Sequence, residues 1–144
     1  MNAALPTIRF ELNGQAVQAH AGETLLEVAD RLGHEVPRLC HKPGYRPDGN
    51  CRACVVEVQG ERTLAPSCCR QPTEGMKVHT HSERALASQR MVLEMLLSDM
   101  PDAPRKWSSA QPEQGGYGEL SDWAHRLGVQ VRPALKAVAR EACA

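Results

Sequence analysis

Hydrophobic and polar residues alternate at the start of the chain, and the pattern then changes to a helical period. Every second residue of 7–12 is apolar, which predicts a half-buried strand. Asn13-Gly14 follows and is a strong signal for a tight hairpin turn, so a second strand is expected over residues 15–19. Over residues 23–32 the apolar positions recur at helical spacing, which predicts a helix.

An irregular stretch separates this helix from a second group of short strands. Residues 37–50 are rich in Pro and Gly, which predicts irregular backbone. Valine-rich residues 54–58 predict a strand, and residues 62–65 and 76–79 predict two more. This order of elements favours a small mixed sheet packed on one helix, which is an α+β fold of the β-grasp type.

The last part of the chain is expected to be helical. Residues 83–98 carry Leu, Val and Met at helical spacing, and Ser82 is a candidate N-cap. Residues 120–127 and 133–143 are candidates for short amphipathic helices.

The 144 residues accommodate one small domain with an appendage. We therefore expect a β-grasp domain over residues 1–81 and a helical extension over residues 82–144. A stretch near residues 102–118, rich in Pro, Gly, Ser and Gln, is expected to be a linker within that extension.

Charge and composition narrow the function classes. Lys plus Arg and Asp plus Glu are both 17, so the net charge is +0, which argues against a nucleic-acid or membrane partner. Residues 1–6 lack the features of a secretion signal, and no segment reaches the roughly 18 apolar residues of a membrane helix. We therefore expect a cytoplasmic protein, in which clustered cysteines bind metal or act in redox chemistry.

The six cysteines are the chain's clearest candidates for chemistry. The spacing C-x10-C-x2-C-x13-C is formed by Cys40, Cys51, Cys54 and Cys68, and Cys69 follows directly. Four thiolates are the usual ligand set of a [2Fe–2S] cluster. Four thiolates also bind structural zinc, although zinc ribbons usually pair two C-x2-C knuckles and this chain has one.

Other features of the same region bear on this choice. A thioredoxin-type dithiol would place C-x2-C at the start of a helix, whereas Cys54 leads into a predicted strand.

For Cys143, alone near the end of the sequence, no ligand role is expected. Basic side chains that could offset the negative charge of a cluster are His41, Lys42, Arg46 and Arg52.

Two segments carry a resemblance to a known family. Residues 39–58 read L-C-H-K-P-G-Y-R-P-D-G-N-C-R-A-C-V-V-E-V, and residues 64–78 read L-A-P-S-C-C-R-Q-P-T-E-G-M-K-V. They resemble the N-terminal [2Fe–2S] domain of the alpha subunit of NAD-linked formate dehydrogenase. This domain also occurs in the large cluster-bearing subunit of complex I and in diaphorase subunits of NAD-reducing hydrogenases. The resemblance covers about residues 7–100 and implies a β-grasp, ferredoxin-like fold. It implies the cluster ligands Cys40, Cys51, Cys54 and Cys68.

The adjacent cysteines require a choice between two candidate ligands. In the family, a Ser-Cys pair is followed by a Gly seven positions after the Cys, and Ser67, Cys68 and Gly75 match this pattern. Because a strand or tight loop turns its next side chain away, we expect only one of the pair to face the cluster. We favour Cys68, with Cys69 as a packing residue or a rescue ligand.

The resemblance implies a carrier of single electrons with no catalytic site of its own. Its partners would be a flavin subunit that binds NAD(H) and a molybdenum- or tungsten-dependent dehydrogenase subunit, with formate oxidation as the first expectation. Met100 and Ala103 stand where several relatives begin a second, [4Fe–4S] site, so one cluster is expected. The alternatives are a zinc-binding or metal-free assembly or regulatory module, and a truncated relative of a longer cluster-bearing subunit.

Overall fold

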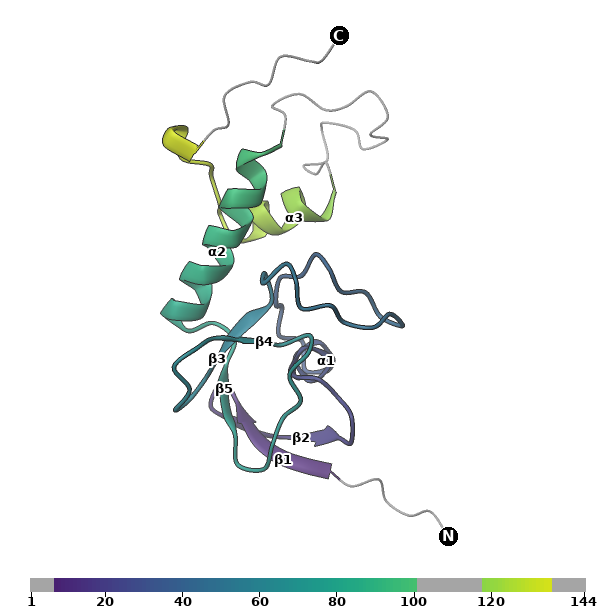
Figure 1. Ribbon diagram of the computed structural model, residues 1–144. Coiled ribbons are helices and arrows are strands. Elements are labelled where there is room, and N and C mark those ends of the chain that lie inside the picture. Colours follow the sequence, from purple (N-terminus) through teal and green to yellow (C-terminus); the bar gives the residue numbers. More distant parts are fainter. Residues whose placement is uncertain (1–6, 101–117, 136–144) are drawn as a thin grey trace. The chain divides into compact units, whose positions relative to one another are not determined.

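The computed structural model describes residues 7–100 and 118–135, and Figure 1 traces them. By their contacts, the residues divide into two compact units, Met1–Gln89 and Arg90–Ala144. The first unit contains a sheet, a helix and the loops that carry all the predicted ligands, and the second unit contains helical segments.

Five strands form one mixed sheet in the order β2-β1-β5-β3-β4 (Figure 1). Their bounds are β1 Thr7–Leu12, β2 Gln15–His20, β3 Val55–Val58, β4 Ala65–Pro66 and β5 Lys77–His79. Strand β1 pairs antiparallel with β2, where Phe10 is opposite Val17, and parallel with β5, where Leu12 is opposite Val78. Strand β3 runs antiparallel to β4 and to β5. The strands before and after the cysteine-rich loop are therefore joined in one sheet through β5.

The turn between β1 and β2 is fixed by its asparagine. Asn13 and Gly14 both have left-handed backbone, with φ of 51° and 82°, as favoured two-residue hairpin turns require. Oδ1 of Asn13 accepts a hydrogen bond from the N–H of Thr80 at 2.8 Å, and its Nδ2 donates to Oγ1 of Thr80 at 2.8 Å. The hairpin is thereby tied to the chain just after β5.

Helix α1, Leu25–Arg31, packs its apolar residues into the same core as the strands. Thr24 caps the helix, since its Oγ1 accepts from the N–H of Glu27 at 3.3 Å and the Glu27 carboxylate accepts from the N–H of Thr24 at 2.7 Å. The shared core includes Leu12, Leu25, Leu26, Val28, Val56 and Val78. A mixed sheet packed on one helix confirms the predicted α+β fold of β-grasp type.

Two elements begin two or more residues later than the sequence predicted. The strand expected over residues 62–65 is reduced to β4. Arg62 lies in a bend, and its carbonyl accepts a hydrogen bond from the guanidinium of Arg84 instead of from a neighbouring strand. The helix expected over residues 23–32 begins later, because Thr24 is its N-cap and is extended.

Helix α2, Glu83–Ser98, begins in the first unit and ends in the second. Oγ of Ser82 accepts from the N–H of Ala85 at 3.2 Å, so Ser82 caps the helix as predicted. Gln89 is 1% exposed, and its Nε2 donates to the carbonyls of Val55 at 2.9 Å and Thr80 at 3.3 Å. The first turns of α2 are therefore anchored to the sheet.

The second unit contains the end of α2 and helix α3, Glu119–Arg126, close to the predicted residues 120–127. Oε1 of Glu94 accepts from the backbone N–H of Arg132 at 2.9 Å and from its Nε at 2.8 Å. Nε of Arg90 donates to the carbonyl of Leu127 at 3.2 Å. These bonds tie the chain after α3 to the last turns of α2.

Several predictions for the helical extension concern segments that lie partly or wholly outside the residues that the structure describes. Of the helix expected over residues 133–143, the structure describes one short 3₁₀ segment, η2, Pro133–Leu135. The expected linker near residues 102–118 is described only at Gly118, and Cys143 is outside the described residues. No helix within residues 7–100 or 118–135 combines the length and apolar character needed to cross a membrane.

Candidate metal centre

The long loop between α1 and β3 carries three of the predicted ligands. Cys40 and Cys51 are half-buried on this loop, and Cys54 is buried where β3 begins. Arg52 has a left-handed φ of 59°, an uncommon conformation for a residue with a side chain. Residues with this uncommon backbone conformation are concentrated at functional loops, and Arg52 lies in the short connection between Cys51 and Cys54.

Cys40 and Cys51 are brought together although ten residues separate them. The backbone N–H of Cys51 donates to Sγ of Cys40 at 3.5 Å. The sulfur of Cys40 is therefore oriented by the backbone N–H of Cys51.

Cys54 and Cys68 are brought together by the pairing of β3 with β4. The N–H and Oγ of Ser67 both donate to the carbonyl of Cys54, at 3.1 Å and 2.6 Å. The carbonyl of Ser67 in turn accepts from the N–H of Leu26, in the first turn of α1, at 3.0 Å. The residue before Cys68 is thus held by the end of the cysteine loop and by the N-terminus of α1.

Cys68 is completely buried, and its surroundings favour the neutral thiol. Burial raises the pKa of Cys68 well above the ordinary value of a thiol, and the neighbouring thiols of Cys54 and Cys69 raise it further. A thiol binds metal as the thiolate, so a metal ion at this position must replace the proton.

A fifth thiol lies beside these four. Cys69 is exposed, and its Sγ is 3.5 Å from Sγ of Cys68. Residues 67–69 form a turn, in which Cys68 is buried and Cys69 is exposed although their sulfurs are in contact. The expectation that only one of the pair faces the cluster stays a prediction. Which of the two sulfurs binds iron stays a prediction.

Two contacts relate the predicted ligands to one another, from the N–H of Cys51 to Sγ of Cys40 and between the neighbouring thiols of Cys54 and Cys68. Among the described residues, no three His, Cys, Asp or Glu side chains are grouped so that they could hold a single metal ion. A [2Fe–2S] cluster is held by four thiolates shared between two irons.

Comparison with known proteins identifies the family of this domain. A family model described as a 2Fe-2S iron-sulfur cluster binding domain matches residues 6–83, which include the sheet, helix α1 and the predicted ligands. The chain belongs to this family. It therefore binds a [2Fe–2S] cluster, and its β-grasp fold is that of a 2Fe-2S ferredoxin-like domain.

Individual relatives are parts of larger redox proteins. The chain is 36% identical over 131 residues to the NADP-reducing hydrogenase subunit HndD of Solidesulfovibrio fructosivorans, covering 88% of this chain and 22% of that protein. It is 34% identical over 122 residues to a subunit of the NADH-quinone oxidoreductase of Rhizobium meliloti (strain 1021), covering 84% of this chain and 14% of that protein. A crystal structure of an NAD+-reducing [NiFe]-hydrogenase in the H2-reduced state superposes with a TM-score of 0.69 at 28% identity, covering 86% of this chain and 50% of that one.

These figures define the extent of the similarity. The chain spans less than a quarter of the length of the first two relatives. The family match ends at residue 83, whereas the relatives match 84–88% of the chain, so the similarity continues into the helical extension.

His41 provides a direct test of whether the loop suits a cluster. Its Nδ1 is buried and has no hydrogen-bond partner among the described residues. A buried polar atom without a partner is unfavourable, and such an atom is usually served by a bound group or water. Because His41 follows Cys40 directly, a cluster sulfur is a suitable partner for this nitrogen.

The backbone of the cysteine loop also suits an anionic cluster. In this loop the N–H of Tyr45 donates to the carbonyl of Lys42 at 3.2 Å. Backbone N–H groups of this loop can donate to sulfur, as that of Cys51 does to Sγ of Cys40. The side chains of Lys42, Arg46 and Arg52 are exposed, and their predicted role in offsetting cluster charge stays a prediction.

The sequence predicted the thiols but not the groups that position them. The hydrogen bonds of Ser67 to Cys54 and to Leu26 join residues that are far apart in the sequence. Only the Ser-Cys pair of the family pattern pointed to Ser67, and nothing in the sequence indicated the bond from α1.

Proposed function

We propose that this chain carries single electrons, through one [2Fe–2S] cluster, within an NAD-linked oxidoreductase of the formate dehydrogenase type. When bound, such a cluster accepts and releases one electron at a time. The observation that carries the proposal is the pairing of Cys40 with Cys51 and of Cys54 with Cys68 inside the family's domain.

We propose the ligands Cys40, Cys51, Cys54 and Cys68, two to each iron. Their support is the spacing, the contact of the Cys51 N–H with Sγ of Cys40, the neighbouring thiols of Cys54 and Cys68, and the family match over residues 6–83. The chain's own groups would orient the thiolates through the N–H of Cys51 and through Ser67.

The proposed partners are a flavin subunit that binds NAD(H) and a molybdenum- or tungsten-dependent dehydrogenase subunit. Two relatives are named as subunits of an NADP-reducing hydrogenase and of an NADH-quinone oxidoreductase, which supports a nicotinamide-linked complex. The choice of formate rests on the resemblance of residues 39–58 and 64–78 to formate dehydrogenase.

The remaining parts of the proposal concern organisation and location. We propose a cluster domain over residues 1–81 and an extension over residues 82–144 that adjoins other parts of the complex, since the similarity to relatives continues past residue 83. We also propose a cytoplasmic location, where the thiols stay reduced until iron is inserted.

The first experiment is anaerobic purification of the full chain followed by cluster reconstitution. We expect about two iron and two acid-labile sulfide per chain and, after reduction with dithionite, the electron paramagnetic resonance of one [2Fe–2S] cluster. A colourless protein without iron and sulfide would overturn the proposal.

The second experiment identifies the electron donor. A complex purified from its own cells through a tag on this chain should show reduction of the cluster by formate and by NADH. Reduction by dihydrogen but not by formate would indicate that the partner is a hydrogenase and not a formate dehydrogenase. Reduction by NADH alone would indicate a complex related to NADH-quinone oxidoreductase.

A further inference from the structure

Cys69 lies in an unusual position for an exposed cysteine, in contact with a buried one. Its Sγ is 3.5 Å from Sγ of Cys68, which is completely buried. The turn is tight, because the N–H groups of Cys69 and Arg70 both donate to the carbonyl of Pro66, at 3.1 Å and 3.0 Å. This turn keeps the two sulfurs next to each other.

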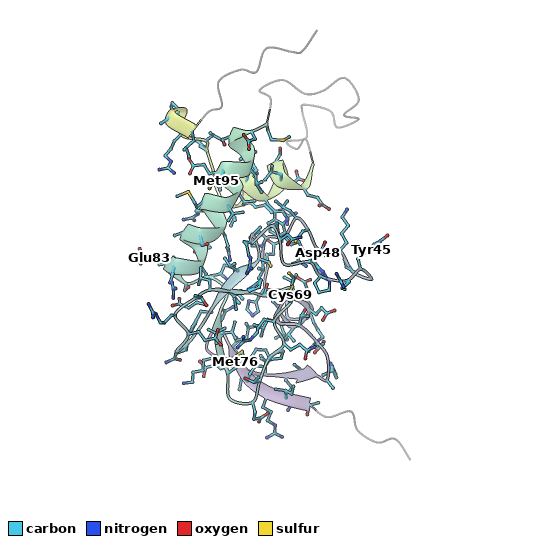
Figure 2. All side chains as sticks on the ribbon, in the orientation of Figure 1. Tyr45, Asp48, Cys69, Met76, Glu83 and Met95 are labelled. Atoms are coloured by element: carbon cyan, nitrogen blue, oxygen red, sulfur yellow. The ribbon has the colours of Figure 1, made fainter. Side chains whose placement is uncertain are left out.

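The cysteine loop makes room for the sulfur of Cys69 at Gly49. A Cβ atom added at Gly49 would lie 2.9 Å from Sγ of Cys69, closer than real contacts allow. Gly49 is buried and has a left-handed φ of 66°. In Figure 2, Cys69 lies near Asp48, the neighbour of Gly49, and Tyr45 marks the outer part of the same loop.

We propose that Cys69 donates its S–H to the iron-bound sulfur of Cys68 and thereby raises the reduction potential of the cluster. The inference rests on the proposed function, in which Cys68 is a ligand. Either sulfur could donate in the free thiols, but an iron-bound thiolate has no proton and can only accept. Cys69 is therefore a positioning residue that acts on the cluster through Cys68.

The direction of the effect follows from charge. Reduction adds one negative charge to the cluster, and part of it is carried by the thiolate sulfurs. A hydrogen bond to such a sulfur is stronger in the reduced state, so it favours reduction. Gly49 contributes by allowing the loop to lie against Cys69 without displacing its sulfur.

The test compares Cys69→Ala with Cys69→Ser in the full chain carrying a reconstituted cluster. The readout is the midpoint of a redox titration followed by electron paramagnetic resonance. Because S–H is a weak donor, we expect the alanine variant to be about threefold harder to reduce, which is about 28 mV at 59 mV per tenfold change. Serine retains a donor, so its midpoint should stay above that of alanine. Equal midpoints for wild type and Cys69→Ala would overturn the inference.

A second variant changes the same contact from the other side. Gly49→Ala places a methyl group against Sγ of Cys69, so its midpoint should fall toward that of Cys69→Ala. Combining Gly49→Ala with Cys69→Ala should lower the midpoint no further, since both changes remove one interaction. Gly60→Ala is the matched control, because Gly60 also has a left-handed φ, of 89°, but a Cβ there would meet nothing within 4 Å. A full additional shift in the double variant would contradict the proposal.

Iron and sulfide analysis separates this inference from the proposed function. If the wild-type chain holds no cluster, the proposed function fails. If Cys69→Ala loses the cluster and Cys68→Ala retains it, Cys69 is the ligand and the inference is overturned, while electron transfer through a [2Fe–2S] cluster stands.

Discussion

The backbone N–H of Cys51 points at the sulfur of Cys40, with 3.5 Å between the nitrogen and Sγ. The two residues bound most of the irregular loop, so the loop is closed by the backbone N–H of Cys51 and the thiol of Cys40. Arg52, with its left-handed backbone, then connects this pair to Cys54 and the sheet. A substitution at either end of the loop should therefore affect the cluster more than the fold.

The first prediction concerns the ligand set. Replacing any one of Cys40, Cys51, Cys54 or Cys68 by Ser should remove or strongly change the visible absorption and paramagnetic signal of the cluster, because an oxygen replaces a thiolate ligand. Iron content measured after identical reconstitution is the check. Cys69→Ser is the matched control and should keep its iron; the reverse result for Cys68→Ser and Cys69→Ser would exchange the two roles.

The second prediction concerns the buried nitrogen of His41. Because Nδ1 of His41 has no partner among the described residues, we expect it to lie within range of the cluster's unpaired spin in the reduced protein. Spin-echo spectroscopy of protein labelled with ¹⁵N in the histidine rings should show a coupling that disappears in His41→Phe. His34→Phe should keep the coupling, because Nδ1 of His34 lies 3.4 Å from Nδ2 of Asn13 and is already partnered. A wild-type protein without any ring-nitrogen coupling would contradict the prediction.

The third prediction concerns the hairpin turn. Asn13→Ala should destabilise the cluster-loaded protein by roughly 2–3 kcal/mol, since it removes two hydrogen bonds to Thr80 and places a side chain unsuited to left-handed backbone at φ 51°. Asn13→Gly loses the same bonds without the backbone penalty, so its loss should be smaller by about 1 kcal/mol. Denaturant unfolding followed by circular dichroism measures both, with the exposed Gln15→Ala as the control.

If Asn13→Gly proved as destabilising as Asn13→Ala, the left-handed backbone would not contribute to the cost. If neither variant differed from Gln15→Ala, the bonds to Thr80 would not stabilise the protein. Both outcomes concern the stability of the fold and do not depend on the function of the cluster.

Local patterns were sufficient to predict most of the fold. The alternation in residues 7–12, the Asn13-Gly14 turn and the period of residues 83–98 depend on neighbouring residues, and each element was found within one residue of its prediction. The strand over residues 62–65 failed because a distant side chain, Arg84, competes for its backbone. No local pattern contains that information.

The same distinction applies to the metal centre. The spacing of the thiols and the resemblance to a family indicated which cysteines to consider, and the family match supports the cofactor. The orientation of Cys68 depends on α1 and β3, and the contact of Cys69 with Gly49 depends on the path of the loop. These are products of tertiary packing, so the sequence alone did not reveal that the sulfur of Cys69 lies beside that of Cys68.

The last prediction concerns pH and the helical extension. Hydrogen bonds from the side chain and the backbone N–H of Arg132 hold the pKa of Glu94 below its ordinary value, and the same contact raises the pKa of Arg132. Because folding lowers the pKa of Glu94, the pair stabilises the extension above the ordinary glutamate pKa of about 4.3, and this contribution is lost as the pH falls through the lowered value. The backbone N–H resonance of Arg132 should therefore titrate with a midpoint below about 4.3. Glu94→Gln retains the hydrogen-bond acceptor without a carboxylate and should abolish that titration; a wild-type midpoint at or above the ordinary value would contradict the prediction.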